Sequence, residues 1–478
     1  MLGARLRQLA GHSAVYGLGG IVSRLVAVFL LPIYTRYLDT ADLGAVGVLI
    51  ALTAVLVTIL RGGISSAFFR FTFDSSDPAR RRTVLRTSFW FTMGTATLGL
   101  LAGLLLAAPI AELLGLEERG PTLVRAAFVG LWAQMNYEQL TAVFRVEQRP
   151  FPFVAASLAN IAITVGATVL LVVVWEQGAL GVIAGNFAGT LAVYLALLGY
   201  RREQLGLELD RPLLREMQRF GLPLVPSALA LIAVSFGDRF FLSHLSGLDE
   251  VGLYEIGVRI ASAMVLLLTA FRTAWPAFAY SIEDDAEAKR TYAFVLTYLV
   301  LVASWLALAL GLLAPWLVRL LATEEFYAGE RVVAPLAFAA AVFAGYVVVS
   351  IGVGRAKRTQ FNWAIAGAAA LLNVALNLLL IPTYGMEGAA AATVAAYALL
   401  FVAMAAWGQR VYRVPYQWRR VATALAAAVG LTVLGKALDV PLAGAIGLAL
   451  AYPLVLLPLG FYLPAERARL KRAVAVLR

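Results

Sequence analysis

The sequence predicts an all-α integral membrane protein with about fourteen transmembrane helices, arranged as two six-helix lobes related by an internal repeat and followed by two C-terminal helices. Hydrophobic residues occupy 61% of the 478 positions, far more than in a soluble domain. Apolar runs of about 20 residues, each long enough to cross roughly 30 Å of hydrocarbon as a helix, recur from end to end. They are rich in Ala, Leu and Gly and lack alternation, which favours helices over strands.

The apolar runs place the spans in order along the chain. Arg5 and Arg7 precede a first run that is too long for a signal-peptide core, so this run is predicted to be a retained transmembrane helix. Segment 201–219 is predicted to be a cytoplasmic connector helix. Its apolar stripe consists of Leu205, Leu209, Leu213 and Met217. The predicted spans cover residues 13–38, 42–66, 83–108, 122–145, 151–175, 179–200, 221–243, 250–275, 290–315, 331–353, 361–381, 387–409, 418–435 and 441–463.

The net charge of +11 is explained by membrane topology. When successive loops are assigned to alternate sides, one set of loops with both termini carries 28 of the 39 lysines and arginines, and the other set carries five. Positive charge accumulates on the cytoplasmic side, so both termini are predicted to be cytoplasmic. The acidic loop 281–290 runs against this bias, but acidic residues weigh little in the rule.

Three pairs of motifs recur at nearly one offset, which indicates an internal repeat. The acid-aliphatic-Gly motif at 42–44 returns at 250–252, and Gly-x-x-Gly at 178–181 returns at 385–388. Basic loops also precede Phe151 and Phe361. Because six helices per copy is an even number, both lobes enter the membrane in the same sense, and substrate sites in such folds lie between the lobes. The predicted divisions are an N-terminal lobe 1–200, the connector 201–219, a C-terminal lobe 220–410, and the last two helices with a cytoplasmic tail 411–478.

Six arginines interrupt the apolar runs. A cation in hydrocarbon costs at least a few kcal/mol, so such a residue usually faces a polar cavity or a partner. Arg24 and Arg259 fall near the middle of their spans, where neither surface is easily reached. Arg61 is intermediate. The arginines near span ends, which can alternatively reach the surface, are Arg125, Arg239 and Arg272.

The spans hold only three acids, Glu138, Asp238 and Glu255, so local pairing cannot neutralise all six arginines. Glu255 lies four residues before Arg259 and can pair with it on one helix. Glu138 can hold Arg145, an arginine of another span or a transported proton. The excess of membrane-buried positive charge suggests a pathway for an anion.

Amide side chains lie on the same helical faces as small polar residues in two further spans. Asn160 shares a face with threonines, and Asn373 and Asn377 are one turn apart. Hydrogen bonding between helices explains such stripes, and contact with sugar hydroxyls is the alternative.

Several kinds of chemistry find no support in the sequence. There is no Walker A motif for nucleotide phosphates, and the only histidines, His12 and His244, form no metal-ligand cluster. Cysteine is absent, so disulfides are excluded. We expect no cofactor, no metal site, no nucleic-acid partner and no enzymatic activity; a coupling ion, Na⁺ or H⁺, remains open.

Five short segments of the chain are typical of one family of membrane transporters. They are 31–38 (LPIYTRYL), 62–71 (GGISSAFFRF), 238–239 (DR), 251–254 (VGLY) and 274–276 (AWP). Through them the chain resembles the polysaccharide flippases, the Wzx-like O-antigen and exopolysaccharide transporters of the MOP superfamily, which also contains the MATE exporters and lipid II flippases. The resemblance extends over all the predicted spans and the connector.

The resemblance implies a flippase that moves an undecaprenyl-diphosphate-linked oligosaccharide, as in lipopolysaccharide or exopolysaccharide synthesis, from the inner to the outer leaflet. It implies alternating access with a cationic central cavity, in a bacterial or archaeal plasma membrane. We expect a monomer in contact with membrane lipids, with polysaccharide polymerase or assembly proteins open as partners. The diphosphate contacts we expect are Arg24, Arg61 and Arg259, followed by Arg239 and Arg272. Glu138, Asp238 and Glu255 are expected to pair or to couple an ion, and the candidate sugar contacts are Asn160, Asn373 and Asn377.

Other functions stay open at this stage. A MATE-like exporter of organic cations is disfavoured by the buried positive charge, whereas a lipid II flippase is chemically close. A membrane glycosyltransferase would need acids at the outer surface, where Asp39 and Asp42 are the early candidates.

Overall fold

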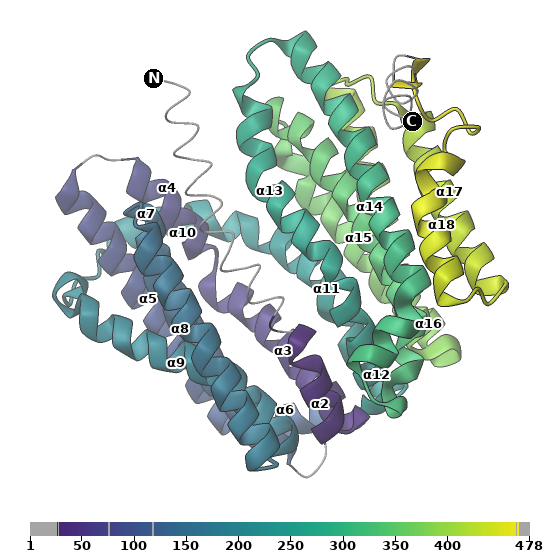
Figure 1. Ribbon diagram of the computed structural model, residues 1–478. Coiled ribbons are helices and arrows are strands. Elements are labelled where there is room, and N and C mark those ends of the chain that lie inside the picture. Colours follow the sequence, from purple (N-terminus) through teal and green to yellow (C-terminus); the bar gives the residue numbers. More distant parts are fainter. Residues whose placement is uncertain (1–25, 27, 75–76, 117–118, 465, 468–478) are drawn as a thin grey trace. The chain divides into compact units, whose positions relative to one another are not determined.

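A computed structural model describes residues 26, 28–74, 77–116, 119–464 and 466–467 of the chain (Figure 1). Every regular element in these ranges is a helix, so the predicted all-helical class is confirmed. Ten of the described helical segments are long and apolar enough to cross a membrane. Most of the predicted first span, including Arg24, lies outside the described residues.

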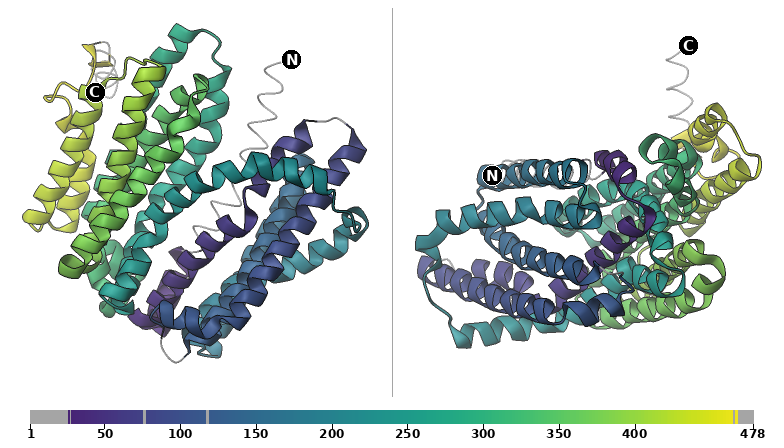
Figure 2. Two further views of the ribbon diagram at one scale, coloured as in Figure 1. Left: turned by 180° about the vertical axis from the view of Figure 1, so that it is seen from behind. Right: turned by 90° about the horizontal axis from the view of Figure 1, so that it is seen from below.

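The helices of the first half of the chain follow the predicted spans closely. They are α2 (Leu31–Tyr37), α3 (Thr40–Arg61), α4 (Ile64–Phe73), α5 (Pro78–Leu105), α6 (Ala107–Leu113), α7 (Gly120–Val146), α8 (Pro150–Val169), a π-helical turn (Leu170–Val174) and α9 (Gly178–Leu205). Within this group α7 packs against α5 and α9, and α9 packs against α8 (Figure 2). The contacts are close because glycines meet neighbouring helices: Gly130 lies against the ring of Phe187 on α9, and Gly185 against the backbone of Thr168 on α8.

The connector differs from the prediction in where its helix begins. α9 continues to Leu205, the chain bends at Gly206, and α10 spans Arg211–Gly221. The side chain of Asp210 caps α10 by accepting the backbone N–H of Leu213 at 2.9 Å. The predicted apolar stripe is therefore divided between two helices, and Leu209 falls in the bend with 45% of its surface exposed. On α10 itself, Leu213 and Met217 are buried against α4 and α5.

The second half of the chain contains two breaks, of which the apolar runs predicted only the one at Gly385. Its helices are α11 (Val225–Leu245), α12 (Leu248–Ala261), α13 (Ala263–Ser281), α14 (Asp285–Leu321), α15 (Glu330–Arg355), α16 (Asn362–Val411), α17 (Trp418–Ala437) and α18 (Leu442–Val455), with short 3₁₀ turns at Leu222–Leu224, Glu324–Gly329 and Thr359–Phe361. The predicted span 250–275 is interrupted at Ser262, whose hydroxyl donates to the carbonyl of Arg259 at 2.5 Å. The predicted spans 361–381 and 387–409 are the two arms of α16, which bends at Gly385 (φ 52°, ψ −131°).

The chain forms two compact units. The first comprises residues 1–256, 321–328 and 366–392, and the second comprises 257–320, 329–365 and 393–478. In the second unit the C-terminal helices pack against α14 through polar contacts: Trp305 donates to the carbonyl of Ala449 at 2.9 Å, and Ser304 hydrogen-bonds the buried hydroxyl of Tyr452 at 2.8 Å. The predicted lobe boundaries stay a prediction.

The two copies of the acid-aliphatic-Gly motif meet where α3 crosses α12 in the first unit. A Cβ on Gly44 would lie 2.0 Å from the carbonyl oxygen of Leu248, and a Cβ on Gly252 would lie 2.0 Å from that of Thr40. Positions 40 and 44 correspond to 248 and 252 at the repeat offset. Each copy thus contributes one glycine and one carbonyl to a symmetric backbone contact.

The acids of the same motif explain the second pair of repeat motifs. Gly178 and Gly385 both have positive φ, 55° and 52°. A Cβ on Gly178 would lie 2.7 Å from a carboxylate oxygen of Asp42, and one on Gly385 would lie 2.8 Å from a carboxylate oxygen of Glu250. Glu250 also accepts the backbone N–H of Met386 at 2.9 Å. In each copy, the acid that begins one helix lies against the backbone at the start of another.

A methyl group at the crossing is expected to destabilise the fold. In Gly252→Ala the new Cβ would overlap the carbonyl of Thr40, so the free energy of unfolding should fall by about 1–3 kcal/mol. The matched control is Gly94→Ala, because a Cβ at Gly94 has no neighbour within 4 Å in the described chain, and this change should add about 0.5–1 kcal/mol. Thermal unfolding of the detergent-purified variants measures both, and equal melting temperatures would contradict the close crossing.

Candidate functional site

Two clusters of charged side chains flank α3, which packs against α7 on one side and α11 on another in the first unit. In the first cluster, Arg61 at the end of α3 contacts Glu138 on α7, with 2.7 Å between Nη1 and Oε2. Arg61 also donates to the carbonyl of Met135 at 3.3 Å, and Gln134 donates to the other oxygen of Glu138 at 2.9 Å. The side chains of Arg61 and Glu138 are 16% and 39% exposed. This pair is neutral and open to solvent on one side.

The second cluster is sealed. On α11, Arg239 lies 2.6 Å from Asp238 (Nη1 to Oδ1) and 2.8 Å from Glu255 of α12 (Nε to Oε1). Its Nη1 also donates to the carbonyl of Ser235 at 2.8 Å, and the hydroxyl of Tyr254 donates to Asp238. The side chains of Arg239, Asp238 and Glu255 are 4%, 1% and 10% exposed. Two carboxylates share one guanidinium here, so the three ionised side chains carry one net negative charge.

The packing of α3 leaves room for this cluster. A Cβ on Gly47 would lie 2.7 Å from Cγ of Glu255, so the glycine admits the acid against the helix. Desolvation of buried charges costs several kcal/mol each, and it is offset only when geometry and hydrogen bonding are good. The contacts around Arg239 satisfy that condition, because both carboxylates and a backbone carbonyl receive its N–H groups.

The structure shows which of the partners considered in the sequence analysis each acid contacts. Glu138 holds an arginine of another span, Arg61. Arg145 lies instead over the ring of Phe69, 5.0 Å from its centroid. Glu255 holds Arg239, sixteen positions earlier in the chain. The sequence analysis did not identify Tyr254 as a hydrogen-bond partner of Asp238. The one feature of the sequence that could have indicated it is its position next to Glu255 on the same helix.

The remaining intramembrane arginines occupy different surroundings. Arg24 lies outside the described residues. In the second unit, Arg259 is half-buried in the last turn of α12, next to the break at Ser262. Arg272 on α13 is exposed and lies 5.8 Å from the ring centroid of Phe343. Arg125 on α7 is also exposed.

The predicted amide residues are engaged mainly with their own helices. Asn160 accepts the hydroxyl of Thr164 at 3.2 Å. Asn377 donates to Asn373 at 3.1 Å, and both are buried at 0% and 1% exposure. The Nδ2 of Asn373 and the Oδ1 of Asn377 have no partner within the described chain.

A polar network joins the start of α3 to two other segments of the first unit. Thr40 donates to Asp249 at the start of α12, and its hydroxyl lies 3.5 Å from Glu325. Thr323 donates to the carbonyl of Thr35 at 2.7 Å. The repeat motif was the sequence signal for this region, because it aligned the starts of α3 and α12.

Comparisons with known proteins agree with this architecture. The profile of a family described as "Polysaccharide biosynthesis protein" matches residues 9–282, more than half of the chain. None of the curated proteins compared with the chain matches it significantly.

Solved structures of membrane transporters share the fold. The inward-facing conformation of a multidrug resistance MATE family transporter of the MOP superfamily is 14% identical, covers 84% of this chain and 98% of its own, and gives a TM-score of 0.69. The lipid II flippase MurJ in an inward closed conformation is 12% identical, covers 92% and 97%, and gives 0.72. An outward-facing MATE structure gives 0.61 at 14% identity, covering 87% and 96%. At identities of 12–14%, these structural similarities establish a shared fold and nothing further.

The two clusters are expected to respond differently to loss of the cation. Arg239→Met leaves two buried carboxylates without their counter-ion, which should cost roughly 3–5 kcal/mol of stability. Arg61→Met should cost about 1 kcal/mol or less, because the side chain of Glu138 is 39% exposed and its charge is less desolvated. Thermal unfolding in detergent at neutral pH measures the difference. Adding Glu255→Gln to Arg239→Met should recover part of the loss, and equal losses at Arg61 and Arg239 would show that the Arg239 cluster is not sealed.

Proposed function

Because the chain belongs to the polysaccharide biosynthesis protein family and has the fold of MATE and lipid II flippase structures, we propose that it is a flippase for an undecaprenyl-diphosphate-linked oligosaccharide, the form that carries O-antigen and exopolysaccharide units. It moves this lipid from the inner to the outer leaflet by alternating access, with both termini in the cytoplasm. The similar structures are transporters and flippases, which supports transport over enzymatic chemistry.

The charge balance inside the spans carries this proposal. The sequence places six arginines and three acids there, and the structure shows all three acids bound by Arg61 and Arg239. By composition, the spans therefore hold three more arginines than acids. A diphosphate suits this excess, because guanidinium groups bind phosphate oxygens with two parallel hydrogen bonds.

We assign a structural or a substrate-binding role to each arginine from its surroundings. Arg239 is enclosed by carboxylates, so we assign it to holding α11 against α12 and not to the substrate. The side chains of Arg61 and Glu138 are 16% and 39% exposed, so we assign Arg61 to the substrate, with a phosphate replacing Glu138 as its partner. Glu138, once released, can take up a coupling H⁺ or Na⁺. We assign Arg259 and Arg24 to the diphosphate from their mid-span positions, with Arg272 at the edge of the path.

Removal of the substrate arginines is expected to stop lipid movement without loss of protein. In proteoliposomes with a fluorescent undecaprenyl-diphosphate oligosaccharide, Arg259→Ala and Arg24→Ala should slow flipping roughly tenfold or more, since each loses charge-assisted hydrogen bonds. Lysine at either position should restore part of the rate. Accessibility of the fluorophore to dithionite measures flipping, and immunoblotting measures abundance. Arg125→Ala, at an exposed position, is the matched control and should flip at the normal rate. Normal flipping in both alanine variants would remove the charge model.

Alternating access also requires the crossing of α3 and α12 to open. The chain has no cysteine, so Thr40→Cys with Asp249→Cys introduces a single pair where the two native side chains touch. Oxidation is expected to join them and to stop flipping, and reduction should restore it. Each single-cysteine variant is the control. Flipping at the normal rate in the fully cross-linked protein would show that this contact does not open during transport.

Lipid II is the second candidate substrate. The MurJ structure gives a TM-score of 0.72 over 92% of this chain, and lipid II also carries a polyprenyl diphosphate. The same proteoliposomes loaded with fluorescent lipid II distinguish the two, because the preferred saccharide should flip faster.

A further inference from the structure

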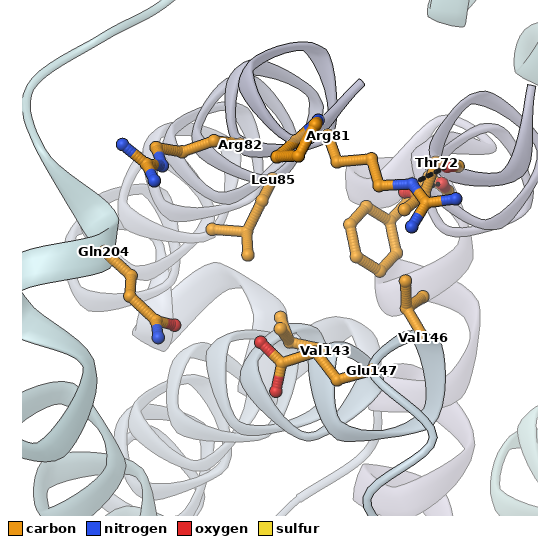
Figure 3. Close-up of a pocket in the computed structure, with 10 residues that line it drawn as sticks. Thr72, Arg81, Arg82, Leu85, Val143, Val146, Glu147 and Gln204 are labelled. Atoms are coloured by element: carbon orange, nitrogen blue, oxygen red, sulfur yellow. Dashed lines mark hydrogen bonds between the residues drawn. The ribbon is translucent and has the colours of Figure 1, made fainter. Parts of the chain in front are cut away.

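A cavity of about 280 Å³ lies in the first unit, and no residue of either charged cluster lines it (Figure 3). It opens between the start of α5, the end of α7 and the end of α9, with α4 along one side. Its inner wall is apolar and is formed by Phe68, Leu85, Val143 and Val146. The predicted apolar run of α5 begins at residue 83, so the cavity lies at the depth where the membrane core gives way to headgroups.

The one acid that lines the cavity is already neutralised. Glu147 receives two parallel hydrogen bonds from Arg201, at 3.0 and 2.8 Å. Arg201 is 1% exposed and also donates to Oε1 of Gln204 at 2.7 Å. That hydrogen bond uses the oxygen of the Gln204 amide and so leaves its nitrogen, Nε2, as the free donor. Nε2 has no acceptor among the described residues. The polar wall therefore offers a donor without repelling an anion.

Two arginines line opposite sides of the cavity, Arg81 beside Thr72 and Arg82 on the side of Gln204 (Figure 3). Arg81 is anchored because its Nε donates to the carbonyl of Thr72 at 3.1 Å. Arg82 forms no ion pair within 4 Å in the described part of the chain, and Figure 3 shows its guanidinium on the same side of the cavity as Gln204. The nearby carboxylate of Glu208 is held by Arg86 at 2.7 Å. The pKa of Glu208 lies below its ordinary value mainly because Arg86 donates this hydrogen bond, and the positive charge of Arg82 adds a smaller lowering.

We propose that this cavity binds the phosphate group of an anionic membrane phospholipid, with the first carbons of its chains against the apolar wall. Ligand pockets usually measure about 300–1,000 Å³, so this cavity is too small for an oligosaccharide but accommodates a headgroup. Arg82 and Gln204 supply the charge and the hydrogen-bond donor, and Arg81 adds a second positive charge. The site is separate from the proposed path of the transported lipid.

Native mass spectrometry of the full chain, released from nanodiscs of phosphatidylglycerol and phosphatidylethanolamine, tests the site. The wild-type protein should retain phosphatidylglycerol. Arg82→Gln removes the charge and Gln204→Glu replaces the donor with a carboxylate, while its oxygen can still accept from Arg201. Each should lower retention roughly tenfold. The control is Arg202→Gln, which removes the same charge from an exposed position outside the cavity and should leave retention unchanged. Melting temperatures in lipid-free detergent should match wild type.

Two competition arms identify the source of the phosphate. Inorganic phosphate at millimolar concentration and undecaprenyl diphosphate are added separately to the phosphatidylglycerol-bound protein. Retention that resists both supports a structural phospholipid. Displacement by inorganic phosphate would overturn the lipid assignment in favour of a soluble anion. Displacement by undecaprenyl diphosphate that depends on Arg82 would overturn it in favour of a substrate entry site. Equal loss in Arg202→Gln would show only general attraction to the basic surface.

Discussion

The close approach of α3 and α12 depends on the missing side chains of Gly44 and Gly252. The carbonyl oxygens of Leu248 and Thr40 occupy the space that a Cβ would fill. In a membrane, apolar side chains gain little by leaving lipid for one another, so helix association relies on this kind of intimate backbone packing. The contact also places Gly47 against Glu255, and so the same approach of two helices positions the acid that holds Arg239.

The charged side chains of the first unit follow from that arrangement. One guanidinium, Arg239, is surrounded by two acids and almost fully buried, whereas Arg61 contacts a single acid that is 39% exposed. Removing a partner from the Arg239 cluster would leave an unpaired charge in a buried environment, which is costly. The two arginines interrupt apolar runs in the same way, but the structure places them in different surroundings.

Much of the fold could be predicted from the sequence, because apolar length and small-residue content are direct consequences of crossing lipid. Most described helices overlap a predicted span, but within the predicted span 42–66 the helix ends at Arg61 and a new one begins at Ile64. The break at Ser262 was missed, since a hydroxyl that bonds to its own helix leaves no trace in hydropathy. The ion-pair partner of each acid could not be predicted either, because it depends on which helices pack together. Glu138 contacts Arg61 because α3 and α7 are neighbours. The repeat motifs did better, because Gly178 and Gly385 both have a positive φ, which few other residues adopt.

The hydrogen bond from the backbone of Met386 to Glu250 has a mechanical consequence. Glu250 begins the helix that touches α3, and Met386 follows the bend at Gly385 that divides α16. A rigid displacement of α12 would pull on the chain just beyond that bend, which has little internal resistance because Gly385 is already outside the helical conformation. The bend angle of α16 at Gly385 would then change, because the hydrogen bond to Glu250 transmits the displacement. In this way the position of α12 and the bend of α16 depend on each other, although the two helices are distant in sequence.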